Sequence, residues 1–446
     1  MSQMKDSGVD WIGNVPKNWE LYPLKQIVSF KTGGTPPLSE GVNFDEGLQW
    51  FKPSDFKGDY SVLDSSENYI SLESVKNNRI NAFPAGTLLM ITIASVGKVG
   101  MISKESYFNQ QITGLTIKDT SLMDTKYLLY VSSVLAKYVK DNTMVSVVPI
   151  VNIAYLSSRR IPVPNVMEQK FIADYLDVET KKIDSMLADA QKSLDILNET
   201  RKSIIFESVT RGLDKSVELK ESGVEWIGRI PVNWTYTKIR YTTRLNGRIG
   251  WQGLTSEEYT DEGPYLITGT DFINGKINFV TAVRIPFKRW QEAKEIQVKN
   301  GDLLITKDGT VGKVAMIEGL ESEASLNSGV LRVRPSNQVQ TRYLYWLLNS
   351  EVFWNWFNYT NGGNSTILHL YQNVFEQFSF PLPSVNEQKR ISEYLDCKIS
   401  IIDDAINKLE QVITLGEESK KSLIYEYVTG KKRVDLYINQ VNEGSD

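Results

Sequence analysis

Histidine and cysteine, which often carry catalysis or bind metals, are scarce in this chain. Its 446 residues include one histidine, His369, and one cysteine, Cys397. A single imidazole disfavours histidine-based acid–base or metal chemistry, so a structural role in a polar loop is the favoured interpretation of His369. The VGKV sequences at 96–99 and 311–314 differ from a phosphate-binding loop, because valine follows the lysine and the glycine spacing is wrong. No spacing singles out a set of carboxylates, and the sequence therefore predicts no catalytic residues and no metal site.

The chain contains two copies of one pattern. KDSGVDWIGNVPKNW (5–19) and KESGVEWIGRIPVNW (220–234) share ten of fifteen residues at an offset of 215. GTLLMITIASVGKVGMI (86–102) and GDLLITKDGTVGKVAMI (301–317) share nine of seventeen at the same offset. PVPNVMEQKFIADYLD (162–177) matches PLPSVNEQKRISEYLD (381–396) at an offset of 219, so the second copy has gained four residues. Two related modules can present two related surfaces to a partner that itself repeats.

Composition removes several classes of protein. An apolar fraction of 41% with 11% aromatic residues is ample for packed cores. One cysteine excludes a disulfide framework. The polar start and the lack of an apolar run of about 20 residues predict a cytoplasmic protein without a membrane partner. The net charge of −4 neither supports nor excludes a polyanionic partner, because a local basic patch decides such binding.

Each copy has a mixed front part and a helical back part. In the front parts, short β-branched runs such as LLMITIA and LLITK are separated by Gly, Asn and Pro, a pattern typical of strands and turns. Helices are expected at 125–139 and 341–357. Their aromatic residues recur at helical spacing, which favours core packing over the alternative of base stacking. The predicted fold class is α+β.

The back parts predict two long helices. Each begins with a capping box, Asn165 with Glu168 and Ser384 with Glu387. A helix over 168–210 would be about 64 Å long. An apolar 4–3 stripe on each helix predicts that the two pair as an antiparallel coiled coil. The residues expected to pack between the helices are Ile183, Leu187, Leu194, Leu197, Ile204, Ile402, Ile406, Leu409, Ile413 and Leu423.

Three further positions qualify this stripe. Arg201 and Lys420 interrupt it at equivalent places in the two helices. Gly416 stands where the first copy has Leu197. This glycine is compatible with a close approach of the helices, or with a weak point that costs about 1 kcal/mol.

The expected organisation is therefore two duplicated α+β domains separated by two long helices. The boundaries are a first domain at 1–164, a central helix at 165–213, a second domain at 214–383, a distal helix at 384–431 and a flexible tail at 432–446.

These motifs resemble the specificity subunit of a type I restriction-modification enzyme. The resemblance rests on the P-x-P-x-x-x-EQ helix starts, the W-I-G-x-x-P-x-x-W openings and the G-K-V turns, and it spans roughly residues 4–431. It implies two target recognition domains, each of which reads one half of a split, asymmetric double-stranded DNA target. It also implies that the helices set the gap between the halves and dock two methyltransferase (M) subunits, while restriction and translocase (R) subunits join the full complex.

The resemblance assigns the chemistry to those partners. S-adenosylmethionine is expected on the methyltransferase subunits, and no cofactor is expected on this chain. Adenine methyltransferases of this kind hold the flipped base with an Asp/Asn/Ser-Pro-Pro-aromatic motif. The Pro-Pro pair at Pro36 and Pro37 lies between Thr35 and Leu38, and it lacks both flanking features. This chain is therefore expected to be a non-catalytic subunit.

Candidate DNA contacts lie in the polar loops. Gln and Asn side chains suit adenine and Arg suits guanine in the major groove, although Gln and Asn also satisfy loop backbones. The lysine in each G-K-V turn could bind a phosphate or could simply be solvated. The candidates are Thr32, Thr35, Lys98, Asn109, Gln110, Gln111, Arg248, Gln252, Lys307, Lys313, Asn364 and Ser365.

Two alternatives belong to other classes of protein. The first is a duplicated coiled-coil scaffold that binds proteins and reads no DNA sequence. Sequence-specific, salt-sensitive DNA retention would count against it. The second is an enzyme with an unrecognised site, which adenine methylation by the purified chain alone would support.

Overall fold

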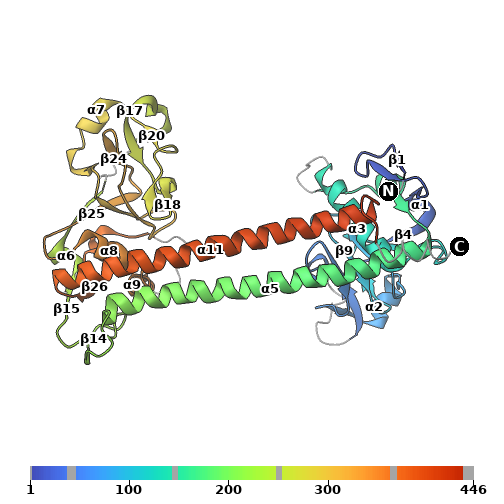
Figure 1. The fold of residues 1–446 in the computed structure, drawn as a ribbon, viewed down its shortest axis with the longest axis horizontal. Coiled ribbons are helices and arrows are strands. Elements are labelled where there is room, and N and C mark those ends of the chain that lie inside the picture. Colours follow the sequence, from blue (N-terminus) through green and yellow to red (C-terminus); the bar gives the residue numbers. More distant parts are fainter. Residues whose placement is uncertain (1–2, 38–46, 143–148, 248–253, 362–368, 435–446) are drawn as a thin grey trace. The chain divides into compact units, whose positions relative to one another are not determined.

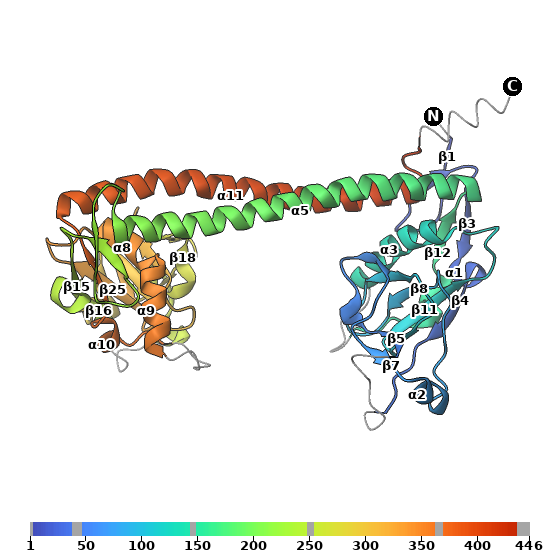
Figure 2. The same cartoon turned by 90° about the horizontal axis from the view of Figure 1, so that it is seen from below.

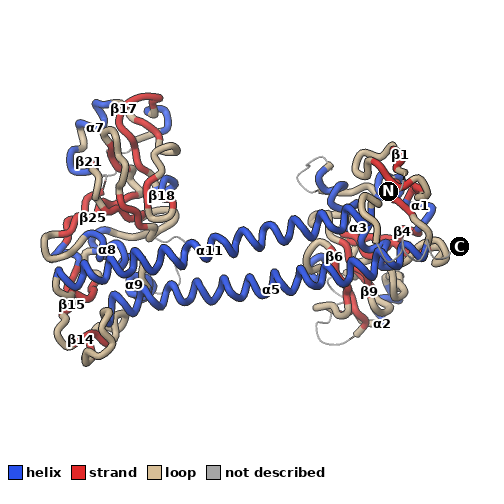
Figure 3. Tube along the Cα trace, in the orientation of Figure 1, coloured by secondary structure: helices blue, strands red, loops and turns tan. Residues whose placement is uncertain are grey.

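The computed structural model describes residues 3–37, 47–142, 149–247, 254–361 and 369–434 (Figure 1). The chain divides into two compact units: the first comprises residues 1–190 and 412–446, and the second comprises residues 191–411. Each unit contains part of both long helices, α5 (Val166–Arg211) and α11 (Val385–Val428). Strands and helices are mixed in both units (Figure 3), and the predicted α+β class with two long helices is confirmed.

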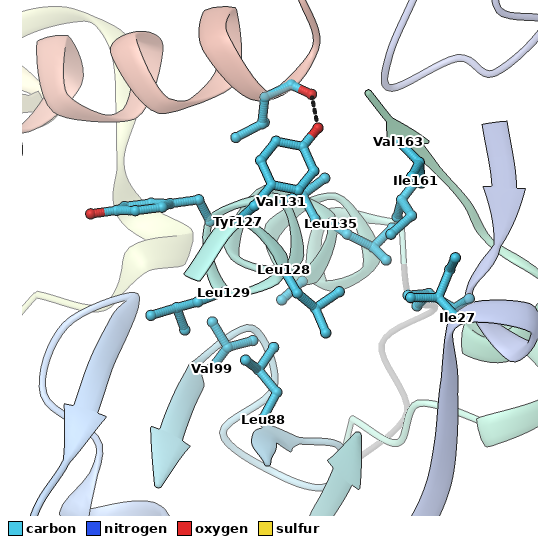
Figure 4. Packing of buried hydrophobic residues seen from close by; sticks show 14 of the residues in the cluster. Ile27, Leu88, Val99, Tyr127, Leu128, Leu129, Val131, Leu135, Ile161 and Val163 are labelled. Atoms are coloured by element: carbon cyan, nitrogen blue, oxygen red, sulfur yellow. Dashed lines mark hydrogen bonds between the residues drawn. The ribbon is translucent and has the colours of Figure 1, made fainter. Parts of the chain in front are cut away.

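The first unit is built on a mixed sheet that helix α3 (Thr125–Asp141) covers. The strand order is β4-β11-β8-β9-β6, with β6 parallel to β9 and the other pairs antiparallel. Figure 4 shows Leu128 and Leu129 of α3 facing Leu88 and Val99 of the sheet, and all four are buried. The strands of this sheet are β4 (Val28–Thr32), β6 (Tyr60–Leu63), β8 (Leu88–Ile91), β9 (Val99–Ile102) and β11 (Ile112–Ile117).

Smaller elements complete the first unit (Figure 2). A second sheet has the order β10-β5-β7, and two antiparallel ribbons pair β1 with β2 and β3 with β12. The remaining bounds are β1 (Met4–Asp6), β2 (Asn14–Pro16), β3 (Glu20–Pro23), β5 (Leu48–Phe51), β7 (Tyr69–Ile70), β10 (Tyr107–Phe108), β12 (Arg160–Val163), α1 (Leu24–Ile27), α2 (Leu72–Asn77) and α4 (Ile153–Ser158).

The second unit repeats this plan with different extensions. Its main sheet has the order β16-β25-β22-β23-β19-β18, a second sheet has the order β20-β17-β24-β21, and ribbons pair β13 with β14 and β15 with β26. The strands are β13 (Leu219–Glu221), β14 (Arg229–Pro231), β15 (Thr235–Lys238), β16 (Thr243–Gly247), β17 (Thr260–Ile267), β18 (Phe272–Ile273), β19 (Lys276–Ile277), β20 (Val283–Arg284), β21 (Gln297–Val298), β22 (Leu303–Thr306), β23 (Val314–Met316), β24 (Ala324–Leu326), β25 (Val330–Pro335) and β26 (Ser379–Leu382). The short helices are α6 (Ile239–Thr242), α7 (Phe287–Gln291) and α10 (Gln372–Phe375).

The helix expected at 341–357 is interrupted. It forms α8 (Thr341–Leu348) and α9 (Glu351–Asn361), with a break at Asn349 and Ser350. The Ser350 hydroxyl donates to the carbonyl of Leu347 at 2.6 Å and accepts from the amide of Val352 at 3.2 Å. Serine thus ends one helix and begins the next, which is the local competition with helix bonds that this side chain favours.

The aromatic residues of these helices form the core, as predicted. Tyr343, Trp346, Phe353, Trp356 and Phe357 are all buried in one cluster of the second unit. In the first unit, Tyr127 and Tyr130 are buried in the same way.

A buried glutamine fixes the start of each long helix. In α5, Gln169 accepts from the amide of Asp124 and donates to the carbonyls of Leu122 and Pro164 at 2.8 Å each. In α11, Gln388 makes the three equivalent bonds, to Gln340, Gln338 and Pro383. Both glutamines are fully buried. The EQ motif therefore joins each long helix to the domain that precedes it.

The N-cap half of each predicted capping box is present, whereas the carboxylates of Glu168 and Glu387 contact Arg433 and Trp234. The amide of Glu168 donates to the Asn165 side chain at 2.9 Å, and the amide of Glu387 donates to the Ser384 hydroxyl at 3.3 Å. The first helix ends before Gly212, whose φ of +75° is the left-handed conformation typical of a glycine after a helix.

Within each unit, segments of α5 and α11 run antiparallel. In the first unit, Asp184 binds Lys420 at 2.6 Å, while the ring of Tyr175, earlier in α5, contacts the ring of Tyr427, later in α11. In the second unit, Arg201 binds Asp403 at 2.7 Å. The two residues that interrupt the apolar stripes thus form equivalent ion pairs between the helices.

The residues expected between the helices lie on their inner sides. Ile402 is buried, and the other nine are half-buried, as a two-helix pair with one open side allows. At Gly416, an added Cβ would lie 2.7 Å from Cδ2 of Leu187. The contact supports the close-approach interpretation of this glycine.

The C-terminal end of each long helix packs on a domain as well. The end of α11 contacts the first unit, and the end of α5 contacts the second. The hydroxyl of Tyr127 contacts the carbonyls of Pro162 (3.0 Å) and Val428 (3.2 Å), the latter drawn in Figure 4. The hydroxyl of Tyr343 contacts those of Pro381 (3.0 Å) and Val209 (3.3 Å). Each domain thus holds the beginning of one long helix and the end of the other.

Candidate nucleic-acid interface

Four segments of the first unit converge into what we call the first loop cluster: Thr32–Thr35, Thr92–Ala94, Asn109–Gln111 and Pro149–Val151. The amide of Gly34 donates to the carbonyl of Phe108 at 2.9 Å. An added Cβ at Gly33 would lie 2.2 Å from that carbonyl oxygen and 2.5 Å from the carbonyl oxygen of Asn109. Only glycine permits this approach, so TGG brings the threonines and the Asn-Gln-Gln segment together.

The predicted contact residues of this cluster differ in how free their side chains are. Asn109 is buried, and its side-chain amide donates to Oε1 of Gln111 at 2.9 Å, while the backbone N–H of Gln111 donates to Asn109 Oδ1 at 3.1 Å. Gln110 and Thr35 are exposed, and the backbone N–H of Gln110 donates to the Thr35 hydroxyl at 3.4 Å. Thr32 is exposed at the end of β4. Gln110, Thr35 and Thr32 can reach a partner, whereas Asn109 and Gln111 mainly order the loop.

Three segments of the second unit form the second loop cluster: Lys307–Gly309, Asn327–Gly329 and His369–Tyr371. The amide of Lys307 donates to the carbonyl of Gly329 at 2.8 Å, and the amide of Leu370 donates to the carbonyl of Lys307 at 2.9 Å. Lys307 and His369 are both half-buried. The predicted candidate Lys307 thus stands beside the histidine to which the sequence assigned only a structural role.

The turns that carry Lys98 and Lys313 connect antiparallel strands, as predicted, but they pack against helices. Nζ of Lys98 donates to the carbonyl of Phe56 at 3.2 Å, which gives this lysine a structural partner. A Cβ at Gly97 would lie 2.8 Å from Lys140 of α3, and one at Gly312 would lie 2.5 Å from Trp354 of α9. Lys313 is exposed, although its amide is bound by the Thr306 hydroxyl at 2.9 Å. Lys98 is therefore the weaker of the two as a phosphate contact.

Four predicted contacts lie outside the described residues. They are Arg248, Gln252, Asn364 and Ser365.

Equivalent ion pairs join each long helix to its domain in the two units. Lys126 donates to Asp177 at 2.6 Å, a bond that raises the pKa of this lysine. The equivalent Arg342 donates to Asp396 at 2.7 Å. Burial raises the pKa of both Tyr127 and Tyr343 well above the usual range, so each phenol stays a neutral hydrogen-bond donor.

Each unit has a groove beside its helix pair. In the first unit, a cavity of about 700 Å³ lies between α3, the start of β6 and both long helices. Lys421, Ser422 and Tyr425 line it from α11. In the second unit, the equivalent side chains of α5 line a cavity of about 440 Å³ together with α9; they are Lys202, Ser203 and Phe206.

The described residues include no group of His, Cys, Asp and Glu side chains that could hold a metal ion. Among these same residues, no helix is both long and apolar enough to span a membrane.

The family model for the type I restriction modification DNA specificity domain matches residues 16–191 and 254–415. The chain belongs to this family. The MjaVIII specificity subunit of a type I restriction enzyme from Methanocaldococcus jannaschii is 23% identical over 427 residues, 94% of each chain. The putative MjaX specificity subunit of the same organism is 24% identical, over 95% of this chain and 96% of its own.

A solved structure shares the fold of this specificity subunit. It comes from work on complex assembly and conformational transition of the type I restriction-modification system, with a TM-score of 0.70 at 14% identity, covering 94% of this chain and 99% of that one. The predicted family is therefore confirmed, and this chain is a DNA specificity subunit rather than a scaffold without DNA reading.

The structure also brings forward residues that the sequence interpretation passed over. Ile93 and Ile150 form an isolated antiparallel bridge in the first loop cluster, and Asp308 contacts Nδ1 of His369 in the second. The signal for them was available, since the offset of 215 aligns Ile93 with Asp308 and the offset of 219 aligns Ile150 with His369.

Proposed function

We propose that each unit reads one half of a split, asymmetric double-stranded DNA target. The observation that carries the proposal is a shared backbone with different side chains. The bond from Thr92 N–H to the Gln111 carbonyl (2.9 Å) is equivalent to that from Lys307 N–H to the Gly329 carbonyl (2.8 Å). One frame that holds unlike polar groups is what reading two unlike half-sites requires.

Two methyltransferase subunits are the proposed protein partners, one at each groove. The grooves occupy equivalent places, and Lys421 and Lys202 stand at equivalent positions in them. In the first groove, Nζ of Lys420 lies between the carboxylate oxygens of Asp184 and over the ring of Tyr60 at 4.9 Å. Burial opposes the charge of Lys420, but the bond to Asp184 raises its pKa, so it stays a cation at the groove wall.

The chemistry is proposed to reside in the partners. The methyltransferase subunits would hold S-adenosylmethionine and methylate adenine, and restriction and translocase subunits would join the full complex in the cytoplasm. This chain would supply recognition alone.

The test is sequence-resolved adenine methylation in cells that carry the chain with its methyltransferase subunits. A split, asymmetric motif should be methylated, and it should disappear when this chain is deleted. DNA retention by the purified complex should fall steeply with salt, because phosphate contacts release counterions. Methylation that persists unchanged without the chain would overturn the proposal.

The helix pair is proposed to set the gap between the half-sites. Removing one heptad from each helix, residues 189–195 and 408–414, keeps the 4–3 stripe and the cross-helix pairing in register. The deletion shortens the pair by about 10 Å, which corresponds to about three base pairs. The methylated motif should keep both half-sites and lose about three unread base pairs. A change in the bases read, with the gap unaltered, would contradict a measuring role for the helices.

A further inference from the structure

The two loop clusters present one pair of side chains from equivalent backbone positions. In the first unit, Val151 N–H donates to the carbonyl of Thr92 at 2.8 Å, which places Ile150 opposite Ile93. In the second unit, Leu370 N–H donates to the carbonyl of Lys307 at 2.9 Å, which places His369 beside Asp308. We call Ile93 with Ile150, and Asp308 with His369, the variable pairs.

The first variable pair is an apolar surface that faces outward. The side chain of Ile150 is 58% exposed, and Ile93 is half-buried. The bonds of Val151 to Thr92 and of Ala94 to Pro149 flank the pair, so it occupies the narrow position of an antiparallel bridge, where opposite side chains come closest. The exposed isoleucine adds little to the core of the unit. It stands in the same cluster as the exposed Gln110.

The second variable pair is polar and oriented. The Asp308 carboxylate contacts Nδ1 of His369, and the imidazole ring packs on the ring of Tyr371 with centroids 4.2 Å apart. The side chain of His369 is 28% exposed. When a neutral imidazole donates Nδ1–H to a carboxylate, its Nε2 at the opposite edge is a hydrogen-bond acceptor. Asp308 thus acts as a positioning residue for the imidazole ring.

We propose that the variable pairs are specificity-determining positions, one in each half-site. The Ile93–Ile150 surface packs against the C5-methyl group of a thymine in the major groove, where apolar side chains distinguish this base. Nε2 of His369 accepts a hydrogen bond from the exocyclic amino group of an adenine or a cytosine, which are the major-groove donors. This inference rests on the proposed reading of DNA by both units.

A purely structural role does not account for the difference between the variable pairs. A core function would require similar volumes at equivalent places, yet one domain has two aliphatic side chains and the other an aspartate in contact with a histidine. One flanking backbone bond is common to the two units, from Val151 N–H to Thr92 in the first and from Leu370 N–H to Lys307 in the second, while the side chains change in kind. Equivalent backbone positions that carry chemically different side chains are suited to selecting a different ligand group in each unit.

The test exchanges the pairs in the full chain, co-expressed with its methyltransferase subunits. The variants are Ile93→Asp with Ile150→His, and Asp308→Ile with His369→Ile. Sequence-resolved methylation should show an altered preference at one base pair of one half-site in each variant, with the other half-site unchanged. Competition binding should show a change of about tenfold in the affinity ratio between the two bases at that position.

Milder variants keep the test decisive if an exchange disturbs folding. Ile150→Ala and His369→Ala should each relax one base preference, whereas Val62→Ala and Val280→Ala are controls at positions that are 51% and 94% exposed in the same two units. Asp308→Ala should weaken the preference read by His369, and Asp308→Asn, which still offers an oxygen to Nδ1, should restore it.

Two outcomes would overturn the inference. One is a folded variant whose base preferences are unchanged in both half-sites. The other is an equal loss of affinity for all sequences, which would assign the pairs to phosphate contact. Failure of the proposed function is distinguishable from both, because then the unmodified chain itself would direct no split methylation motif.

Discussion

The two units hold their long helices with matching side chains, but the glutamate at the start of each long helix has a different partner in each unit. In the second unit, the indole N–H of Trp234 donates to Oε2 of Glu387 at 2.9 Å. In the first unit, the equivalent Glu168 instead accepts from Arg433 at 2.9 Å, and its Oε2 and the indole N–H of Trp19 are buried without a hydrogen bond. The shared fold therefore depends on the helix contacts common to both units, whereas the partner of this glutamate can be either an arginine or a tryptophan.

The difference has a structural cause at the chain's end. Arg433 follows α11 and has Asp214 at its equivalent position after α5. An arginine can reach the Glu168 carboxylate, whereas an aspartate cannot pair with Glu387, so the indole takes that place. Val434, next to Arg433, is also buried in the core of the first unit.

The largest expected effect concerns the glutamines that both units share. Gln169→Leu and Gln388→Leu each leave three backbone groups without their partner, and each should destabilise its unit by about 3 kcal/mol or more. Hydrogen exchange read separately in the two units measures this, since each unit can open by itself. Gln411→Leu, at an exposed position of α11, is the control and should change stability by less than about 0.5 kcal/mol. Unequal losses at Gln169 and Gln388 would break the equivalence of the two units.

The carboxylate comparison predicts the next largest effect. Trp234→Phe removes a hydrogen bond to a charged acceptor, whereas Trp19→Phe removes an indole N–H without a hydrogen bond. Both substitutions lose similar buried surface, so Trp234→Phe should cost about 2 kcal/mol more. Denaturant titrations of the two variants, followed in each unit, measure the difference. A double-mutant cycle of Trp234→Phe with Glu387→Leu should give a coupling energy that accounts for most of this difference. Equal destabilisation by Trp234→Phe and Trp19→Phe would show that the Trp234 bond contributes little.

The two long helices and the way in which they join the domains could be predicted from the sequence, because the signals for them are local and occur twice. Caps, apolar stripes and the EQ motif act within a few residues, so their spacing appears directly in the sequence. The break at Ser350 was missed, because aromatic spacing continues across it and only a side-chain hydroxyl decides it. The bond of Lys98 to the Phe56 carbonyl was also missed, since this partner is 42 residues away in the sequence. Contacts of that kind depend on how distant segments meet.

The helix pair offers a smaller, more local test. The first unit sets Gly416 against Leu187, while the equivalent positions in the second unit carry Leu197 and Ile406. Gly416→Leu should destabilise the first unit by about 1–2 kcal/mol, because the added side chain overfills the contact. Leu187→Ala in the same chain should recover most of that loss. Thermal unfolding of the single and double variants measures the rescue, and its absence would mean that the glycine serves backbone flexibility instead of close approach.

The smallest expected effect lies in the turns beside the loop clusters, where the two units share a conformation with different residues. Ala94 and Gly309 are equivalent and both have a φ of +67°. This left-handed conformation costs a residue with a Cβ about 1 kcal/mol relative to glycine. Ala94→Gly should therefore stabilise the first unit by up to about 1 kcal/mol, and Gly309→Ala should destabilise the second by a similar amount. Nothing lies within 4 Å of a Cβ added at Gly309, so a steric clash does not contribute to the stability change of Gly309→Ala. Opposite signs in the two denaturant titrations would establish that the first loop cluster retains a strained alanine at a position where the equivalent turn uses glycine.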